Sequence, residues 1–204
     1  MNRFIIVLGP WGSGSTAVTG ILDHLGAFTC PPHFKTNDPR TPSAYESEML
    51  RNILLRHIDE QALMVSENRL QLVSEIQQWL GGILQKAGGD DRVVVLKHAL
   101  LSLIMPELVS LLHPKFIIVR RSYTDIERTR VRRQWPPIYG YLGARIIYDR
   151  IYSELVANSN LEFLDVYMPD ILSHPDQEIS RIADFSGLGG DPDCMKNART
   201  FLRC

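Results

Sequence analysis

The sequence of 204 residues is short of cysteine and has no long apolar run. Its three cysteines, Cys30, Cys194 and Cys204, lie far apart and form no C-x-x-C pair, so neither a disulfide framework nor a zinc site is indicated. No stretch approaches the roughly 20 apolar residues of a membrane-spanning helix. The N-terminal run Phe4–Leu8 is too short for the apolar part of a secretory signal. These absences predict a cytoplasmic protein without stable membrane insertion.

Lysine is also scarce, and net charge is nearly absent. The formal net charge is −1, which argues against a protein that coats nucleic acid. Of the 22 basic residues, 17 are Arg, which binds phosphate and carboxylate groups through paired planar contacts. Seven of the 22 lie between Lys115 and Arg133, where only two residues are acidic. The near-neutral net charge is therefore an average over the whole chain. The local excess of basic residues favours binding of a small ligand with several negative charges over binding of a broad polyanion.

Short apolar runs alternate along the chain with segments of helical periodicity. This alternation predicts one α/β domain over residues 1–204, with the three-layer P-loop-type fold in which helices flank a central parallel sheet. The predicted strands are 4–8, 92–96, 116–120 and 161–166. The predicted helices are 15–25, 44–59, 68–87, 99–112, 125–134, 138–157 and 176–186.

Local signals mark several boundaries of these elements. Ser43–Glu46 and Thr124–Glu127 fit the S/T-x-x-E capping box, which predicts a helix start at each. Asp191 followed by Pro192 predicts another helix start. Residues 30–42 contain four prolines and little periodicity, so we expect a loop there.

The strongest motif is G-P-W-G-S-G-S-T at residues 9–16, directly after the first predicted strand. It has the G-x4-G-x-[ST] spacing of a phosphate-binding loop, in which glycines turn backbone N–H groups toward an anion at a helix N-terminus. Ser15 stands where nucleoside-triphosphate loops carry lysine, which disfavours hydrolysis of ATP or GTP but leaves phosphate binding possible. A glycine-rich turn without a ligand is the alternative.

Basic residues follow two other predicted strands. Lys97 and His98 follow the strand at 92–96, and Arg121 follows the strand at 116–120. Carboxyl ends of parallel strands meet at one edge of the sheet, where ligands bind. The sequence thus predicts a crevice with two anion-binding devices and one acid–base group. The arginines at 130–133 fit a solvated, salt-bridged helix face equally well.

Together these motifs resemble those of the sulfotransferase family, particularly its compact bacterial members. Residues 13–16, S-G-S-T, are similar to the SGT[ST] core of the family's loop for a 5′-phosphosulfate. Arg121 and Thr129 resemble its R-x7-S pair, which holds a 3′-phosphate. Further similar segments are Lys97–Pro106 (the strand-end K-x-x segment), Asp38–Arg40 with Tyr45 and Glu46 (NP[KR]GY[FW]E), 170–175 (D-L-L-x-x-P) and 184–188 (FLGL).

The resemblance implies 3′-phosphoadenosine 5′-phosphosulfate (PAPS) as the donor, 3′-phosphoadenosine 5′-phosphate (PAP) as the product, and no metal. The acceptor would be a small molecule or a carbohydrate. Glu46, His98 and His33 are the candidates for the base that takes the acceptor's proton, and Lys97 would stabilise charge on the transferring group. The implied donor-binding residues are Trp11, Gly12, Ser13, Gly14, Ser15, Thr16, Arg121 and Thr129.

The sequence also departs from the family pattern. Gly12 stands where the family usually has Lys or Arg, Thr129 replaces Ser, and Ser122 replaces a common Pro. Two alternatives therefore stay open: a kinase or nucleotide hydrolase with a degenerate loop, and a PAP- or nucleotide-binding protein without turnover. Glu46 also fits a purely capping role. We expect the acceptor pocket to come from residues 30–60 and 134–150, where the aromatic residues Trp135, Tyr139, Tyr141 and Tyr148 gather.

Overall fold

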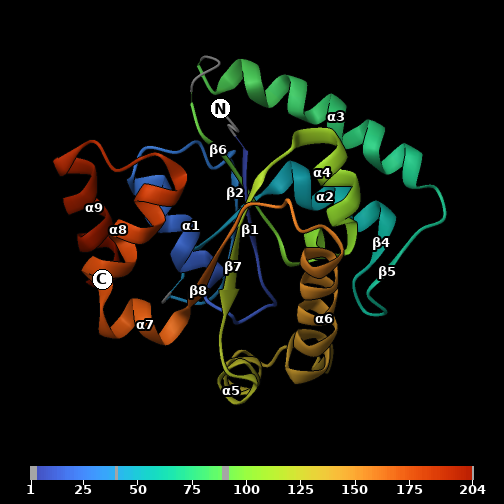
Figure 1. Ribbon diagram of the computed structural model, residues 1–204. Coiled ribbons are helices and arrows are strands. Elements are labelled where there is room, and N and C mark those ends of the chain that lie inside the picture. The colour runs from blue at the N-terminus through green and yellow to red at the C-terminus, as the bar shows by residue number, and fades with distance from the viewer. Residues whose placement is uncertain (1–3, 40, 89–91, 204) are drawn as a thin grey trace.

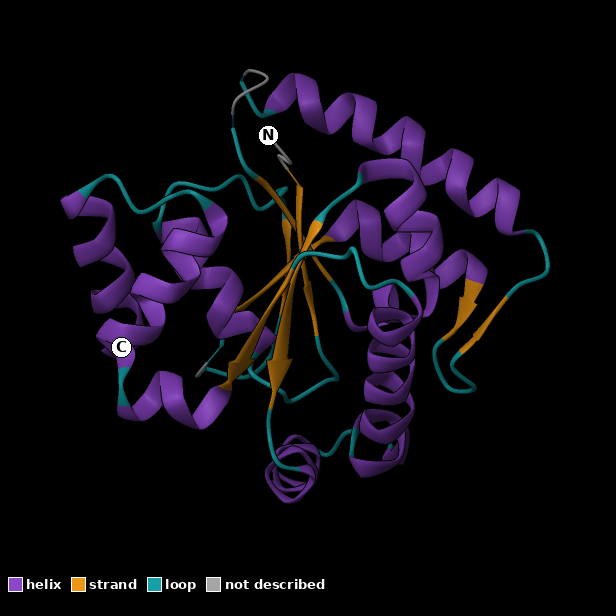
Figure 2. Ribbon diagram, in the orientation of Figure 1, coloured by secondary structure: helices purple, strands orange, loops and turns teal. Residues whose placement is uncertain are grey.

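A four-stranded parallel sheet forms the centre of the computed structural model, which describes residues 4–39, 41–88 and 92–203 (Figures 1 and 2). Arg40 and Cys204 lie outside the described residues. All three neighbouring strand pairs are parallel. The predicted α/β class with a central parallel sheet is therefore confirmed. The strands follow the order β6 (Val94–Lys97), β1 (Phe4–Leu8), β7 (Lys115–Arg120) and β8 (Phe163–Tyr167).

Helices cover both faces of this sheet, which explains why its inner strands are continuously apolar. Alternate residues of β1 enter different core clusters, with Ile6 and Leu8 in one and Ile5 and Val7 in the other. The first cluster is covered by α2 (Glu48–His57), α3 (Arg69–Lys86), α4 (Met105–Leu112) and α6 (Tyr141–Ala157) (Figure 1). The second is covered by α1 (Ser15–His24), α7 (Met168–Ser173), α8 (Pro175–Ser186) and α9 (Pro192–Arg203).

Residues 30–47 differ from the sequence-based expectation. The expected loop contains β2 (His33–Lys35), which pairs in antiparallel fashion with β3 (Ser43–Ser47). The helix expected from residue 44 begins only at Glu48, so the capping box at 43–46 is wrong. Its Glu46 instead forms a buried ion pair with a lysine of the central sheet, a contact that no local pattern reveals.

Other helix boundaries were predicted with mixed success. The helix α5 (Tyr123–Arg133) is capped by Ser122, whose hydroxyl accepts the N–H of Asp125, so the box predicted at 124–127 is wrong by two residues. The start at Pro192 is confirmed, with Asp191 accepting the N–H of the second residue beyond it. The segments 99–112 and 138–157 each begin with a 3₁₀ turn, η1 (Ala99–Ile104) and η2 (Pro137–Tyr139). The helix α7 and the small hairpin of β4 (Ile58–Asp59) and β5 (Met64–Val65) were not predicted.

Within the described part of the chain, no helix combines the length and the apolar character that crossing a membrane requires.

The packing of α1 against α9 predicts opposite effects for two glycine-to-alanine substitutions. A Cβ on Gly20 would lie 2.2 Å from the ring of Phe201, whereas a Cβ on Gly81 of α3 would meet nothing within 4 Å. We expect Gly20→Ala to destabilise the fold by about 1–3 kcal/mol through overpacking. Gly81→Ala should stabilise it by roughly 0.5–1 kcal/mol through helix propensity. Urea unfolding measures both, and equal stability of the two variants would contradict this account of the α1–α9 contact.

Candidate functional site

A cavity of about 550 Å³ opens at the carboxyl ends of β1, β6 and β7. This edge is where parallel sheets place ligand sites. Of the donor-binding and catalytic residues predicted from the sequence, all line the cavity except Ser13, which is fully buried, and His33. Those lining it are Trp11, Gly12, Gly14, Ser15, Thr16, Glu46, Lys97, His98, Arg121 and Thr129.

The glycine loop presents unused hydrogen-bond donors to this cavity. Gly14 caps α1 in the left-handed region, at φ 100°, and offers no side chain to the helix N-terminus. Across the described residues, the N–H groups of Ser15 and Thr16 donate to no protein acceptor, and the buried hydroxyl of Ser13 has no partner. Free N–H groups at the positive end of a helix constitute an anion-binding arrangement.

Arg121 and Thr129, eight residues apart in sequence, meet beside the same loop. Nη1 of Arg121 lies 3.3 Å from the hydroxyl oxygen of Thr129 and donates to the carbonyl of Gly12 at 3.0 Å. No carboxylate of the described residues forms an ion pair with this guanidinium. The hydroxyl of Thr129 itself donates to the carbonyl of Asp125 at 2.9 Å, so the guanidinium of Arg121 supplies the second set of donors close to the glycine loop.

Backbone geometry explains the glycine at position 12. Gly12 has φ 79°, in the left-handed region, where a side chain is strained. A Cβ there would also lie 3.4 Å from both Cβ and Cγ2 of Thr129. A lysine or arginine at this position would therefore be strained by the backbone conformation, whereas its Cβ would make only ordinary contact with Thr129.

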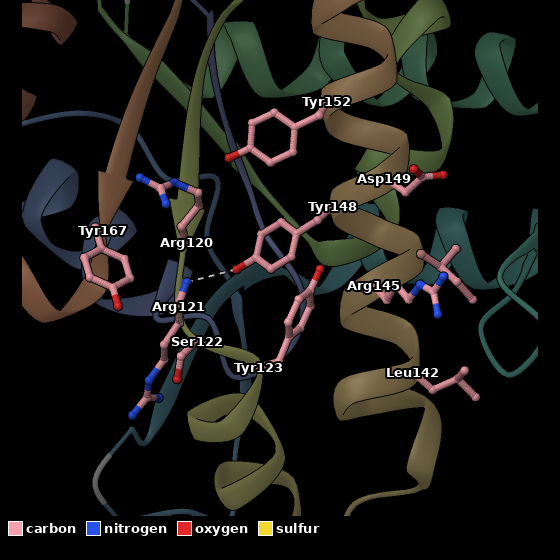
Figure 3. Close-up of a pocket in the computed structure, with 11 residues that line it drawn as sticks. Arg120, Arg121, Ser122, Tyr123, Leu142, Arg145, Tyr148, Asp149, Tyr152 and Tyr167 are labelled. Atoms are coloured by element: carbon pink, nitrogen blue, oxygen red, sulfur yellow. Dashed lines mark hydrogen bonds between the residues drawn. The ribbon is translucent and has the colours of Figure 1, made fainter.

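The end of β7 directs its two arginines to different places. The backbone N–H of Arg121 donates to the hydroxyl of Tyr148 at 3.0 Å, and that hydroxyl donates to the carbonyl of Val119 at 3.2 Å (Figure 3). Burial raises the pKa of Tyr148, so it stays a neutral donor. Arg120 instead contacts Asp165 at 2.6 and 2.8 Å, and it lines a neighbouring pocket rather than this cavity.

Lys97, Glu46 and His98 form a buried cluster at the end of β6. The ammonium of Lys97 lies 2.6 Å from Oε1 of Glu46, 3.0 Å from the carbonyl of Ala44 and 3.4 Å from the hydroxyl of Thr16. Nε2 of His98 is 3.7 Å from Oε2 of Glu46. The lysine thus links the base candidate Glu46 to the last residue of the glycine loop.

Burial and charge set the protonation states in this cluster. Burial by itself raises the pKa of Glu46, but the charge of Lys97, its hydrogen bond and the charge of Arg51 hold it below its ordinary value. Burial lowers the pKa of His98 and keeps its ring neutral. Because Nδ1 of His98 accepts the N–H of Leu100, the neutral ring carries its proton on Nε2, toward Glu46.

Aromatic rings line the other side of the cavity. Trp11 lies 4.3 Å from Tyr139 between ring centroids, and Trp135 meets Tyr139 edge-on. Tyr141 and Tyr148, grouped with them in the sequence, do not line this cavity. His33 does not line it either, and its Nε2 lies 3.0 Å from the carbonyl of Thr29.

Several lining residues carried no sequence signal that pointed to the cavity. Arg132 and Arg133 both pair with Asp38 at 2.8 Å, which ties the β2–β3 connection to α5 and turns these arginines toward the cavity. The exposed Arg132 and the paired Arg130 also fit the salt-bridged helix face expected as the alternative, whereas Arg133 is half-buried. Arg51 and Glu60 also line the cavity. Because these two residues lie far from the motifs along the sequence, the sequence did not predict that they line the cavity.

Comparisons with known proteins point to one fold. Neither protein-family models nor curated proteins give a match to the sequence. Solved structures do. A sulfotransferase domain from the curacin biosynthetic pathway has a TM-score of 0.62 at 20% identity, over 97% of this chain and 78% of that chain. A sulfotransferase from Mycobacterium tuberculosis H37Rv has a TM-score of 0.65 at 15% identity, over 98% of this chain and 71% of that chain. A sulfotransferase domain of the Synechococcus PCC 7002 olefin synthase has a TM-score of 0.62 at 16% identity, over 95% of this chain and 76% of that chain.

The chain therefore has the sulfotransferase fold, as the sequence motifs led us to expect. At these identities the likeness concerns the fold, and the chemistry has to be argued from the residues of the cavity.

The buried ion pair predicts a pH-dependent effect of Glu46→Gln. At pH 7 this substitution leaves the Lys97 charge buried and unpaired, and we expect a loss of about 3–5 kcal/mol in the free energy of unfolding. Since the pKa of Glu46 is lower in the folded state, its contribution is complete above about pH 4.5 and is lost as the pH falls through the folded value. The deficit of the variant should shrink accordingly toward acid.

Denaturant unfolding from pH 7 to well below pH 4.5 measures this difference. Glu162→Gln is the control, since its pair with Lys115 is exposed and should contribute no more than about 1 kcal/mol. A deficit below 1 kcal/mol for Glu46→Gln, or one that does not change with pH, would show that the ion pair does not stabilise the fold.

Proposed function

We propose that the protein is a sulfotransferase that moves a sulfuryl group from PAPS to a hydroxyl or amine of a small-molecule or carbohydrate acceptor. One observation carries the proposal: two separate sets of anion-binding donors, the glycine loop and the Arg121–Thr129 pair, converge on one cavity. PAPS carries anionic groups at both the 3′ and the 5′ position of adenosine. A nucleotide with one phosphate-bearing end would need only one set.

The residues present fit this donor. The free N–H groups of Ser15 and Thr16 and the unpartnered hydroxyl of Ser13 would hold the 5′-phosphosulfate at the positive end of α1. Arg121 and Thr129 would hold the 3′-phosphate, because a guanidinium and a hydroxyl 3.3 Å apart can share the oxygens of one phosphate. When bound, PAPS supplies a sulfuryl group activated by its link to the 5′-phosphate.

Glu46 is the base in this proposal. The acceptor oxygen bonds to sulfur, the bond between sulfur and the 5′-phosphate oxygen breaks, and the acceptor's proton passes to Glu46. His98 is less suited, because its Nδ1 accepts a backbone N–H and its Nε2 holds a proton. His98 acts instead as a positioning residue that faces Oε2 of Glu46.

Lys97 takes the place of the cation that the glycine loop lacks. Its ammonium lies within reach of the Thr16 hydroxyl at the end of the loop, so its charge is available where the transferring oxygens would lie. The same ammonium holds Glu46. One residue of β6 thereby serves both the donor side and the acceptor side of the reaction.

Arg121→Gln tests the donor site. It should weaken PAP binding by about ten- to a hundred-fold, since a hydrogen bond to a charged group contributes roughly 1.5–3 kcal/mol. Binding of adenosine 5′-monophosphate, which lacks the 3′-phosphate, should change little. Calorimetric titration measures both, with Arg120→Gln as the matched control on the adjacent position that faces another pocket.

The wild-type titrations decide between the proposal and its alternatives. Absence of PAP binding rejects a sulfotransferase. Magnesium-dependent ATP binding tighter than PAP binding indicates a degenerate P-loop kinase or hydrolase. Tight PAP binding without sulfate transfer to a broad panel of acceptors indicates a nucleotide-binding protein without turnover.

Tyr148→Phe tests how the backbone of Arg121 is held. The variant keeps the ring but removes the hydroxyl that accepts the Arg121 N–H. We expect a roughly three- to ten-fold loss of PAP affinity, corresponding to one neutral hydrogen bond, with unchanged affinity for adenosine 5′-monophosphate. Tyr152→Phe, which removes a hydroxyl bound to Asp165, is the control. Equal losses for both nucleotides would mean that Tyr148 stabilises the fold rather than the position of Arg121.

A further inference from the structure

Arg51 of α2 is a cavity-lining cation with no assigned role. It is half-buried, and it lines the same cavity as Glu46 and His98. Its guanidinium carbon lies 4.5 Å from the centroid of the Phe34 ring. After the charge of Lys97, the charge of Arg51 also lowers the pKa of Glu46.

The other cations of the cavity are accounted for. Lys97 pairs with Glu46, and Arg132 and Arg133 pair with Asp38. Arg121 donates to the carbonyl of Gly12 and belongs to the proposed 3′-phosphate site. For Arg51, by contrast, the residues at 4–39, 41–88 and 92–203 supply neither an ion pair nor a hydrogen-bond acceptor.

Stacking on Phe34 leaves Arg51 competent to bind an anion. A ring that covers the face of a guanidinium holds the group in place and leaves its in-plane N–H donors free. Two such donors match the two oxygens of a carboxylate. Glu60 also lines the cavity, where burial and this nearby carboxylate raise the pKa of Tyr139, but Glu60 forms no ion pair with Arg51 among the described residues. Arg51 thus has positioned N–H donors that can bind an anionic group of a ligand.

The space beside Arg51 is bounded by rings. Trp11 and Trp135 each contact Tyr139, and these three rings line the cavity together with Phe34. Aromatic walls favour a flat or apolar body in the ligand. A ligand that spans from Glu46 to Arg51 would present a hydroxyl at one end and an anionic group at the other.

We infer that the acceptor is a hydroxy acid, whose carboxylate binds Arg51 while a ring-sized apolar body lies against the aromatic walls and its hydroxyl faces Glu46. This inference rests on the proposed function, because Glu46 is its base and the donor site lies opposite. The transfer itself is unchanged: sulfur gains the acceptor oxygen, loses the 5′-phosphate oxygen, and the hydroxyl proton goes to Glu46.

Paired probes test the charge requirement. Binding of 4-hydroxybenzoate and of 4-hydroxybenzamide, which differ by one negative charge, is measured by calorimetry with and without saturating PAP. We expect wild-type protein to bind the acid at least ten-fold more tightly than the amide. Arg51→Gln should abolish this preference and leave PAP affinity unchanged. Arg56→Gln removes the same charge from an exposed position on the same helix, and this variant should retain both the preference for the acid and the PAP affinity.

The outcomes separate the inference from the proposed function. Failure of wild-type protein to bind PAP rejects the proposed function. Normal PAP binding without a preference for the acid, including no detectable binding of either probe, overturns only the hydroxy-acid acceptor. A preference that survives in Arg51→Gln also overturns it. If Arg51→Gln lowers the affinity for the acid and for the amide equally, Arg51 shapes the pocket without recognising the charge of the ligand, and the inference is again wrong.

Discussion

The ion pair between Lys97 and Glu46 is the constraint on which the cavity depends. Each of these charges, alone in the interior, would cost several kcal/mol, so each requires the other. The pairing holds β3 against the end of β6 and brings Ala44 and Thr16 within reach of the same ammonium. The first anion-binding device and the proposed base are therefore fixed to each other by a single side chain.

A second constraint lies at the end of β7, where the chain leaves the sheet. Arg120 and Arg121 are adjacent, yet their side chains point in different directions (Figure 3). Arg120 pairs with Asp165, and Arg121 donates to the carbonyl of Gly12 in the glycine loop. The backbone of Arg121 has lost its strand partner there, and the hydroxyl of Tyr148 satisfies its N–H. A residue of α6 thus determines where a residue of β7 presents its charge.

These two constraints also explain how far the sequence could be read. The glycine loop and Arg121 were predictable because their signals are local and the topology of a parallel sheet brings strand ends together. Residues 43–46 were misread because a capping box and a strand carrying a charged residue use the same letters, and only the distant Lys97 decides between them. Arg51 was missed for a related reason: its partner ring, Phe34, lies in a segment expected to be a loop.

The linkage of base and cation through Lys97 has a consequence for the proposed chemistry. The charge of Lys97 helps to hold the pKa of Glu46 below its ordinary value, which makes the carboxylate a weak base while the ammonium rests on it. An anion bound at the glycine loop competes for that ammonium, because its third contact is the Thr16 hydroxyl of the loop. In the proposed reaction, an ammonium drawn toward such an anion would restrain Glu46 less, and we expect the pKa of Glu46 to rise. The donor and the base of the proposed reaction are thus coupled through Lys97, the lysine that contacts both the loop and Glu46.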